Sequence, residues 1–252
     1  MPNPQCVENA PTLSASSGEG CVQEFAGLNT YITGSPDSKV AILLVTDVFG
    51  YEATYGGYEA PIFRKLADKI AAAGFLVVVP DFFCGDPFDM QKNRTDWLAA
   101  HGLNKGFEDA KPVISALKSM GVSAIGAAGF CWGAKEVVEL AKSDEMQAVV
   151  LLHPSRVTVD DIREVKSPIS ILGVEIDHTS PPEILKQFEE ILSVKPKVSF
   201  LVMIFPGVAH GWTVRYDEAD ELAIKKAEEA HMDMLNWFTK YIKSQIFFPS
   251  PL

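Results

Sequence analysis

The chain has 252 residues, of which 47% are hydrophobic, and its 33 acidic and 22 basic side chains give a formal net charge of −11. This length and composition fit a single globular α/β domain. The negative charge would repel a phosphate backbone, so nucleic acid is not expected as a partner. Apolar runs in the chain are short, and Phe75 to Val79, for example, spans about five residues. A membrane span needs roughly 20, so no membrane partner is expected either.

The N-terminal region has no basic segment followed by an apolar one, which is the pattern of a secretory signal. The four cysteines, Cys6, Cys21, Cys84 and Cys131, match no zinc-binding spacing. We therefore expect reduced thiols, a cytoplasmic location, a monomer or homodimer, and neither a metal nor a cofactor. We expect three regions, which are a mobile leader at 1–20, one domain at 21–245 and a tail at 246–252.

Strands and helices alternate along the expected domain. A hairpin around Gly27 is predicted at 21–33, and a strand buried on both faces at 39–46. Apolar residues at helical spacing predict a helix at 61–73, which ends before Gly74. The later expected elements are strands at 75–79, 122–127, 147–152, 168–174 and 198–204, and helices at 105–120, 134–142, 181–192 and 217–243. This alternation predicts an α/β fold with a mostly parallel sheet and helices on both faces.

The segment Gly129-Phe130-Cys131-Trp132-Gly133 lies between a predicted strand and a predicted helix. It has the form of the G-x-S-x-G nucleophile elbow with cysteine in place of serine. Such a tight turn needs small residues beside the nucleophile, and the two glycines supply them. A thiol at the N-terminus of a helix has a lowered pKa, because the helix dipole favours the thiolate. We predict that Cys131 is a nucleophile. The alternative is an unreactive buried cysteine beside packing glycines.

An acid and a histidine follow the elbow, each after a later strand. Asp177 follows the strand at 168–174, and His210 follows the strand at 198–204. The chain order of nucleophile, acid and histidine is that of the α/β-hydrolases. His210 would accept the thiol proton through Nε2, while the acid holds the other ring nitrogen. Glu175 and His178 are alternatives to Asp177 in this orienting role.

The loop after the first long strand reads Thr46-Asp47-Val48-Phe49-Gly50. The backbone N–H groups of Val48 and Trp132 are well placed to form an oxyanion hole, which stabilises the negative charge of a tetrahedral intermediate. Asp47 is expected either to interact with the cysteine in the resting enzyme or to serve as a turn residue.

Other loops that converge on Cys131 carry candidates for substrate binding. Aromatic walls with a few polar groups suit a flat, largely apolar acyl group. Arg215 is expected to pair with a substrate carboxylate or to form a surface salt bridge, and Cys84 to line the pocket or to fill space. The aromatic candidates are Tyr58, Phe82, Phe83, Trp132 and Trp212.

Four motifs resemble the dienelactone hydrolase family, namely GFCWGAK at 129–135, HPS at 153–155, EIDHTSPP at 175–182 and PGVAHGW at 206–212. The resemblance runs from about residue 39 to residue 241, and the chain closely resembles the plant branch, in which some members carry a β-glucanase name. It implies an α/β-hydrolase fold without a large cap domain. It also implies that Asp177 completes the triad, and that small esters or lactones are hydrolysed through an acyl-cysteine without a metal or cofactor.

Two other functions are considered. A glycan hydrolase needs two carboxyl groups across a sugar-sized cleft, and Asp47, Asp81, Asp86 and Asp177 are candidates. A thiol at an elbow has no role in that mechanism. A non-catalytic receptor for a small ligand is the other alternative, but the presence of all three triad residues favours an enzyme.

Overall fold

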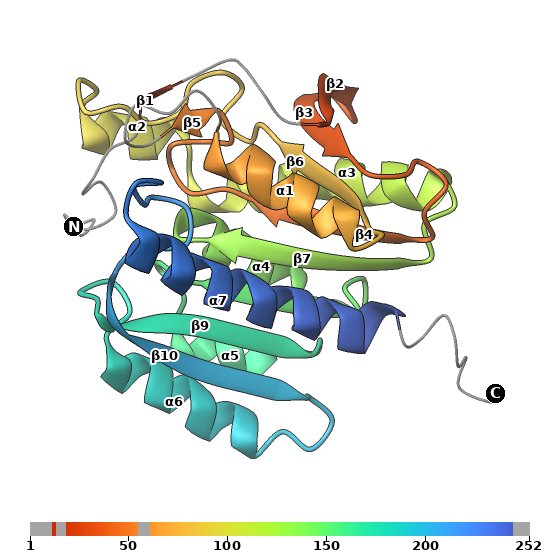
Figure 1. Cartoon of the computed structure of the whole chain (residues 1–252). Coiled ribbons are helices and arrows are strands. Elements are labelled where there is room, and N and C mark those ends of the chain that lie inside the picture. Colours follow the sequence, from red (N-terminus) through yellow and green to blue (C-terminus); the bar gives the residue numbers. More distant parts are fainter. Residues whose placement is uncertain (1–11, 14–18, 55–60, 244–252) are drawn as a thin grey trace.

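The computed structural model describes residues 12–13, 19–54 and 61–243, and Figure 1 shows their arrangement around one large sheet. The eight strands of this sheet lie in the order β10-β9-β8-β7-β4-β6-β3-β2. All neighbouring pairs are parallel except β2–β3 and β3–β6. The strands are β2 (Cys21–Phe25), β3 (Leu28–Thr33), β4 (Val40–Val45), β6 (Leu76–Pro80), β7 (Ala124–Phe130), β8 (Ala148–Leu152), β9 (Ile169–Ile176) and β10 (Phe200–Ala209).

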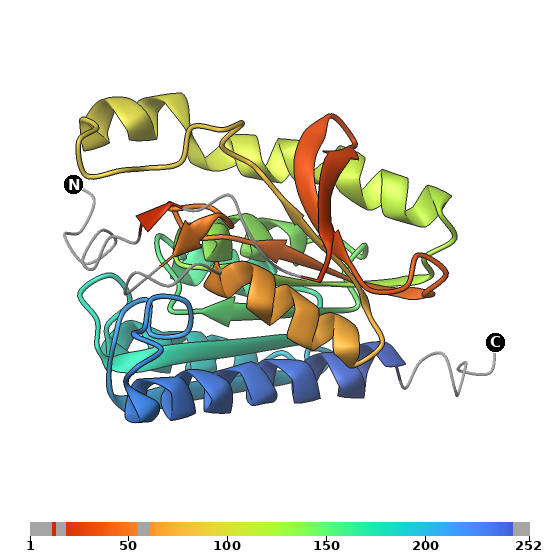
Figure 2. The same ribbon diagram turned by 45° about the horizontal axis from the view of Figure 1, so that its top comes forward.

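Helices cover both faces of the sheet (Figures 1 and 2). One face packs against α1 (Ile62–Ala72), α7 (Glu221–Phe238) and the short π-helix η2 (Thr239–Lys243). The other packs against α3 (Leu103–Ser119), α4 (Trp132–Leu140), α5 (Val159–Glu164) and α6 (Pro182–Ser193). The predicted mostly parallel α/β sheet is confirmed, and no large cap domain is inserted among the described elements.

The central strand β4 shows why its sequence is apolar without interruption. Successive side chains of a strand point to opposite faces. Leu43 and Val45 therefore lie in the core beneath α3 and α4, whereas Ile42 and Leu44 lie in the core beneath α1 and α7. All four are fully buried, and each such side chain contributes roughly 1.5–3 kcal/mol of burial free energy.

The N-terminal region is partly attached to the domain. The predicted hairpin is confirmed as β2 and β3, and it turns at Ala26 and Gly27, whose φ values are 55° and 85°. Within the expected leader, β1 (Thr12–Leu13) pairs antiparallel with β5 (Ala53–Thr54). The backbone N–H of Gly20 also donates to the hydroxyl of Tyr31 at 2.8 Å. Residues 1–11 and 14–18 of the expected leader, which include Cys6, lie outside the described residues, as does the expected tail at 246–252.

Two short helices were not expected from the sequence. The first, α2 (Arg94–Ala100), begins after Asn93, whose side chain accepts the N–H groups of the first helical turn. The second, α5, begins at Thr158, which forms a reciprocal capping box with Asp161. Each helix is too short to show a clear apolar period, so only these capping residues could have predicted it.

A carboxyl group is buried behind the elbow helix. Glu136 lies one turn after Trp132 in α4, and only 1% of its surface is exposed. Gly106 of α3 leaves the room for it, since a Cβ on that glycine would lie 2.9 Å from the Glu136 carboxyl carbon. Burial raises the pKa of Glu136 to about 8. A hydrogen bond from the Phe107 backbone N–H lowers the pKa, but by less than burial raises it. The folded protein therefore holds a proton there that the unfolded chain releases near pH 4.5.

This buried proton predicts a pH-dependent stability. Between pH 4.5 and about 8 the folded state binds more protons than the unfolded state, so the free energy of unfolding falls as pH rises through this window. We expect Glu136→Gln to remove this part of the pH dependence and to raise stability at pH 8 by about 2–4 kcal/mol. Urea unfolding at pH 5 and pH 8.5 measures this, with the exposed Glu189→Gln as a control. A parent-like pH dependence in Glu136→Gln would contradict the expectation.

Candidate active site

Cys131 occupies a strained turn between β7 and α4. Its backbone has φ 51° and ψ −108°, and the residue is fully buried at the N-cap position of α4. A non-glycine residue in such a conformation costs about 1–3 kcal/mol. Two backbone hydrogen bonds to the chain at the end of β8 hold it. Cys131 donates its N–H to the carbonyl of Leu152 at 3.1 Å, and its own carbonyl accepts the N–H of Ser155 at 3.0 Å.

The two glycines of the elbow are needed for close backbone packing. A Cβ on Gly129 would lie 2.2 Å from the carbonyl oxygen of Gly133. A Cβ on Gly133 would lie 2.2 Å from the carbonyl oxygen of Val45, at the end of β4. Backbone atoms cannot move aside as a flexible side chain can. The spacing of the motif thus follows from the contact between α4 and the carboxyl ends of β4 and β7.

The predicted acid and histidine meet at the same edge of the sheet. His210 follows β10 directly, and its Nδ1 lies 2.7 Å from Oδ2 of Asp177, which follows β9. Both side chains are only 1% exposed. The other carboxylate oxygen of Asp177 accepts the backbone N–H groups of Thr179 and Ser180 at 2.6 and 3.2 Å.

This environment keeps Asp177 ionised. Burial alone would raise the pKa of Asp177, but the hydrogen bond and positive charge of His210 together with the two backbone N–H groups outweigh it and hold the pKa below its usual value. The two alternatives for the orienting role are on the surface, unlike Asp177. Glu175 is exposed, 3.4 Å from the backbone nitrogen of Gly207, and His178 is also exposed. Asp177 is therefore the carboxylate that holds the ring of His210.

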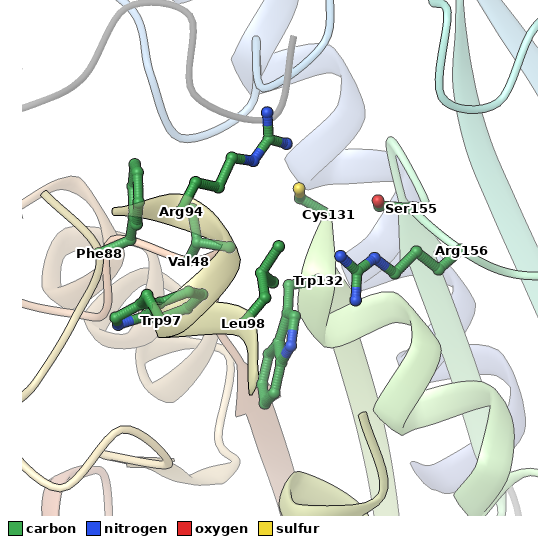
Figure 3. A pocket seen from close by; sticks show the side chains of 9 residues that line it. All are labelled: Val48, Phe88, Arg94, Trp97, Leu98, Cys131, Trp132, Ser155 and Arg156. Carbon is green, nitrogen blue, oxygen red and sulfur yellow. The ribbon is translucent and has the colours of Figure 1, made fainter. Parts of the chain in front are cut away.

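A small cavity of about 20 Å³ adjoins Cys131, as Figure 3 shows. This volume accommodates about one water molecule. Cys131 and the predicted oxyanion-hole residues Val48 and Trp132 come together here. The remaining lining residues were not predicted from the sequence, because most belong to α2 and to the loop after β8. They are Phe88, Arg94, Trp97, Leu98, Ser155 and Arg156.

The predicted aromatic and thiol candidates occupy different positions around this cavity. Phe83 packs against two tryptophans that line the cavity, and its ring centroid lies 4.8 Å from that of Trp132 and 5.1 Å from that of Trp97. Phe82 is buried in the core on the α3 and α4 side of the sheet. Cys84 lies exposed in a turn with φ 54° and is not among the described lining residues. Tyr58 lies outside the described residues.

Asp47 and Arg215 form a buried ion pair close to the elbow. Asp47 Oδ2 lies 3.3 Å from Nε of Arg215, and the two side chains are only 3% and 2% exposed. Asp47 Oδ1 also accepts the backbone N–H of Phe49 at 3.0 Å, and the Arg215 guanidinium lies over the Phe49 ring at 5.4 Å. Asp47 therefore stabilises the turn of its own loop, which is one of the two roles considered for it, and it also pairs with Arg215. Arg215 forms a salt bridge, but the salt bridge is buried. The expectation that it would lie on the surface was wrong.

A second cavity of about 420 Å³ lies between the carboxyl end of β10, the loop that follows it and the start of α7. His210, Trp212 and Arg215 are among its lining residues. The Trp212 ring packs against the His153 ring, with centroids 5.4 Å apart. Trp212 is therefore placed on the histidine side of the site, whereas Trp132 is on the cysteine side.

Within the described part of the chain, no group of three His, Cys, Asp or Glu side chains is arranged to hold a metal ion. Nor does any described helix combine the length and apolar character required to cross a bilayer.

The sheet order, the strained cysteine between β7 and α4, and the acid and histidine after β9 and β10 define an α/β-hydrolase. The model of the dienelactone hydrolase family matches residues 28–242, and the chain belongs to this family.

Two proteins of similar sequence and one solved structure of similar fold illustrate this membership. It is 44% identical over 202 residues to a Zea mays protein named endo-1,3;1,4-beta-D-glucanase, a match that covers 78% of this chain and 64% of the maize protein. It is 34% identical over 209 residues to a carboxymethylenebutenolidase homolog of Xenopus tropicalis, covering 80% and 82% of the two chains. A Klebsiella pneumoniae structure described as a dienelactone hydrolase superposes with a TM-score of 0.69 at 20% identity, covering 92% and 98%. This last likeness concerns the fold.

Proposed function

We propose that the protein hydrolyses small carboxylic esters or lactones through a Cys131–His210–Asp177 triad. The observation that carries the proposal is the buried His210–Asp177 pair at 2.7 Å, which lies at the edge of the sheet where the elbow presents Cys131. Membership of the dienelactone hydrolase family supports it. The proposed enzyme acts in the cytoplasm, as a monomer or homodimer, without a metal or cofactor.

The proposed reaction has two halves. His210 takes the proton of the Cys131 thiol, and the thiolate attacks the substrate carbonyl carbon. The backbone N–H groups of Val48 and Trp132 stabilise the negative oxygen of the tetrahedral intermediate. The intermediate collapses to an acyl-cysteine as the leaving oxygen takes the proton from the imidazolium. A water molecule, deprotonated by His210, then attacks the acyl carbon, releases the acid and restores the thiol. Asp177 keeps the ring in the required tautomer throughout.

A glycan hydrolase remains the second candidate, because the maize relative carries a glucanase name. The candidate carboxylates, however, are already engaged in other contacts. Asp47 pairs with Arg215, Asp177 with His210, and Asp86 with Lys92 and His101. The remaining candidate, Asp81, accepts the backbone N–H groups of its own turn. These contacts support the ester or lactone hydrolase instead.

One substrate screen separates the candidates. The purified protein is assayed on p-nitrophenyl esters, on small lactones and on mixed-linkage β-glucan, with Cys131→Ala in parallel. The proposed function predicts turnover of esters or lactones that is lost in the variant. Release of reducing sugar that survives Cys131→Ala would overturn it in favour of a glycan hydrolase, and binding of a lactone without turnover would indicate a receptor.

The charge of the cavity predicts a substrate preference. Arg94 and Arg156 are the charged residues among its described lining, and both are positively charged. Figure 3 shows the Arg156 side chain extending towards Trp132, and the Arg94 side chain towards Cys131. A guanidinium that pairs with a carboxylate in a partly dry site contributes about 1.4 kcal/mol or more, which is about tenfold in rate. We therefore expect a higher kcat/KM for p-nitrophenyl hydrogen glutarate than for the matched neutral valerate ester.

Arg156→Gln tests this preference, since glutamine keeps much of the length without the charge. We expect the ratio of the two kcat/KM values to fall by about tenfold, while Arg163→Gln, an exposed arginine of α5, leaves the ratio unchanged. An unchanged ratio in Arg156→Gln would show that this arginine does not recognise the acyl charge.

A further inference from the structure

A second histidine lies against His210 inside the protein. His153 follows β8 and is fully buried. Its ring meets the His210 ring nearly edge to face, with centroids 5.0 Å apart and an interplanar angle of 65°. Its Nε2 lies 2.8 Å from the hydroxyl of Thr213, which is also fully buried. The reaction proposed above assigns no role to either residue.

Thr213 belongs to the turn that carries His210. This turn is closed by backbone hydrogen bonds from Trp212 to Ala209 at 3.1 Å and from Val214 to Gly211 at 3.0 Å. The Thr213 carbonyl accepts a further hydrogen bond, at 2.8 Å, from Nε2 of His231 in α7. Burial lowers the pKa of His231 to about 4, so this ring is neutral at physiological pH and carries its proton on the donating nitrogen. The turn is thus attached both to α7 and to His153.

The chain around His153 also holds the elbow. Leu152, the residue before it, accepts the backbone N–H of Cys131, and Ser155, two residues after it, donates to the Cys131 carbonyl. The bond between His153 and Thr213 therefore joins the segment that fixes the nucleophile's backbone to the turn that fixes His210. These segments are 60 residues apart in the sequence.

The surroundings of His153 keep it uncharged. Rings of Phe130 and Trp212 pack against it, and the charged groups that face it are His210, paired with Asp177, and Arg215, paired with Asp47. Burial, followed by the positive charges of His210 and Arg215, holds the pKa of His153 well below its usual value. A neutral ring matters because a second positive charge would oppose the imidazolium that His210 becomes when it takes the thiol proton.

We propose that His153 and Thr213 are positioning residues that fix the ring of His210 relative to the thiol of Cys131. The inference rests on the proposed triad and adds two residues to it that need not touch the substrate. A displacement of about 1 Å between reacting groups can reduce a rate by about 100-fold. Loss of the hydrogen bond between His153 and Thr213 should therefore slow the chemical step and raise the pKa of the Cys131 thiol, with little effect on substrate binding.

The matched variants Thr213→Val and Thr213→Ser test the proposal, because valine keeps the shape of threonine and serine keeps the hydroxyl. On a p-nitrophenyl ester we expect Thr213→Val to lower kcat by about tenfold or more with KM changed less than about twofold, and Thr213→Ser to restore most of the rate. The pH dependence of Cys131 alkylation by iodoacetamide, followed by peptide mass, reports the thiolate without any substrate. Its midpoint should rise by about one pH unit in Thr213→Val, since a misplaced imidazole stabilises the thiolate less.

Each outcome bears on one of the two proposals. If Thr213→Val retains the parent's kcat and alkylation midpoint, the positioning role is wrong, although Cys131-dependent hydrolysis by the parent would still uphold the triad. The positioning role is also overturned if kcat falls in Thr213→Val while the alkylation midpoint stays at the parent's value and Thr213→Ser restores no activity. Thr213 would then have a structural role only. If the parent's own turnover does not require Cys131, the proposed function fails first.

Discussion

Cys131→Ala is expected to abolish ester hydrolysis, with a fall in kcat/KM of about 10⁴-fold or more. The thiolate is the proposed attacking group, and the structure provides the turn that presents it, with φ 51° at the N-terminus of α4. Alanine removes the sulfur and leaves the backbone free to keep the same conformation. The loss should therefore be chemical, and circular dichroism and the melting temperature should match those of the parent.

The matched control for this variant is Cys84→Ala. Cys84 also has a positive φ, 54°, but it lies exposed on the surface. We expect it to retain the parent's kcat/KM. Residual hydrolysis by Cys131→Ala within about tenfold of the parent would mean that another group is the nucleophile.

Asp177→Asn is expected to lower kcat/KM by about 10²–10⁴-fold, with the fold intact. Asparagine can keep the oxygen that accepts the N–H groups of Thr179 and Ser180. The second oxygen, which lies 2.7 Å from Nδ1 of His210, becomes an NH₂ group that cannot accept a hydrogen bond from the ring N–H. The ring then favours the tautomer with its proton on Nε2, and this nitrogen can no longer take the thiol proton.

The measurement for Asp177→Asn is kcat/KM on the same ester, beside the melting temperature. Glu175→Gln is the control, because Glu175 is an exposed carboxyl two residues away at the same strand end. Equal losses in both variants would point to a general effect of charge at this edge. A loss in Asp177→Asn alone is the result that the hydrogen bond to His210 predicts.

The elbow and the chain order of the site could be predicted from the sequence because both reflect local constraints. Gly129 and Gly133 are small since backbone lies within 2.2 Å of where their Cβ atoms would be. In a parallel sheet, residues that follow different strands gather at one edge, so Cys131, Asp177 and His210 could be expected together. The continuous apolar run of β4 likewise follows from its burial on both faces.

The walls of the cavity could not be predicted in the same way. Trp97 is the only buried residue of α2, so the sequence of this helix has almost no apolar periodicity. The burial of the Asp47–Arg215 pair and the contact of His153 with Thr213 depend on which loops meet in space. A single sequence shows that such residues follow strands, but not which of them meet.

The most direct test of the account is to trap the proposed intermediate. The protein is mixed with p-nitrophenyl acetate, quenched in acid within the first turnovers and examined by intact and peptide mass spectrometry. The account predicts one acetyl group per chain, located on the Cys131 peptide and absent from Cys131→Ala. Continued ester turnover with the acetyl group on another residue, or with no acyl-protein at any quench time, would contradict it.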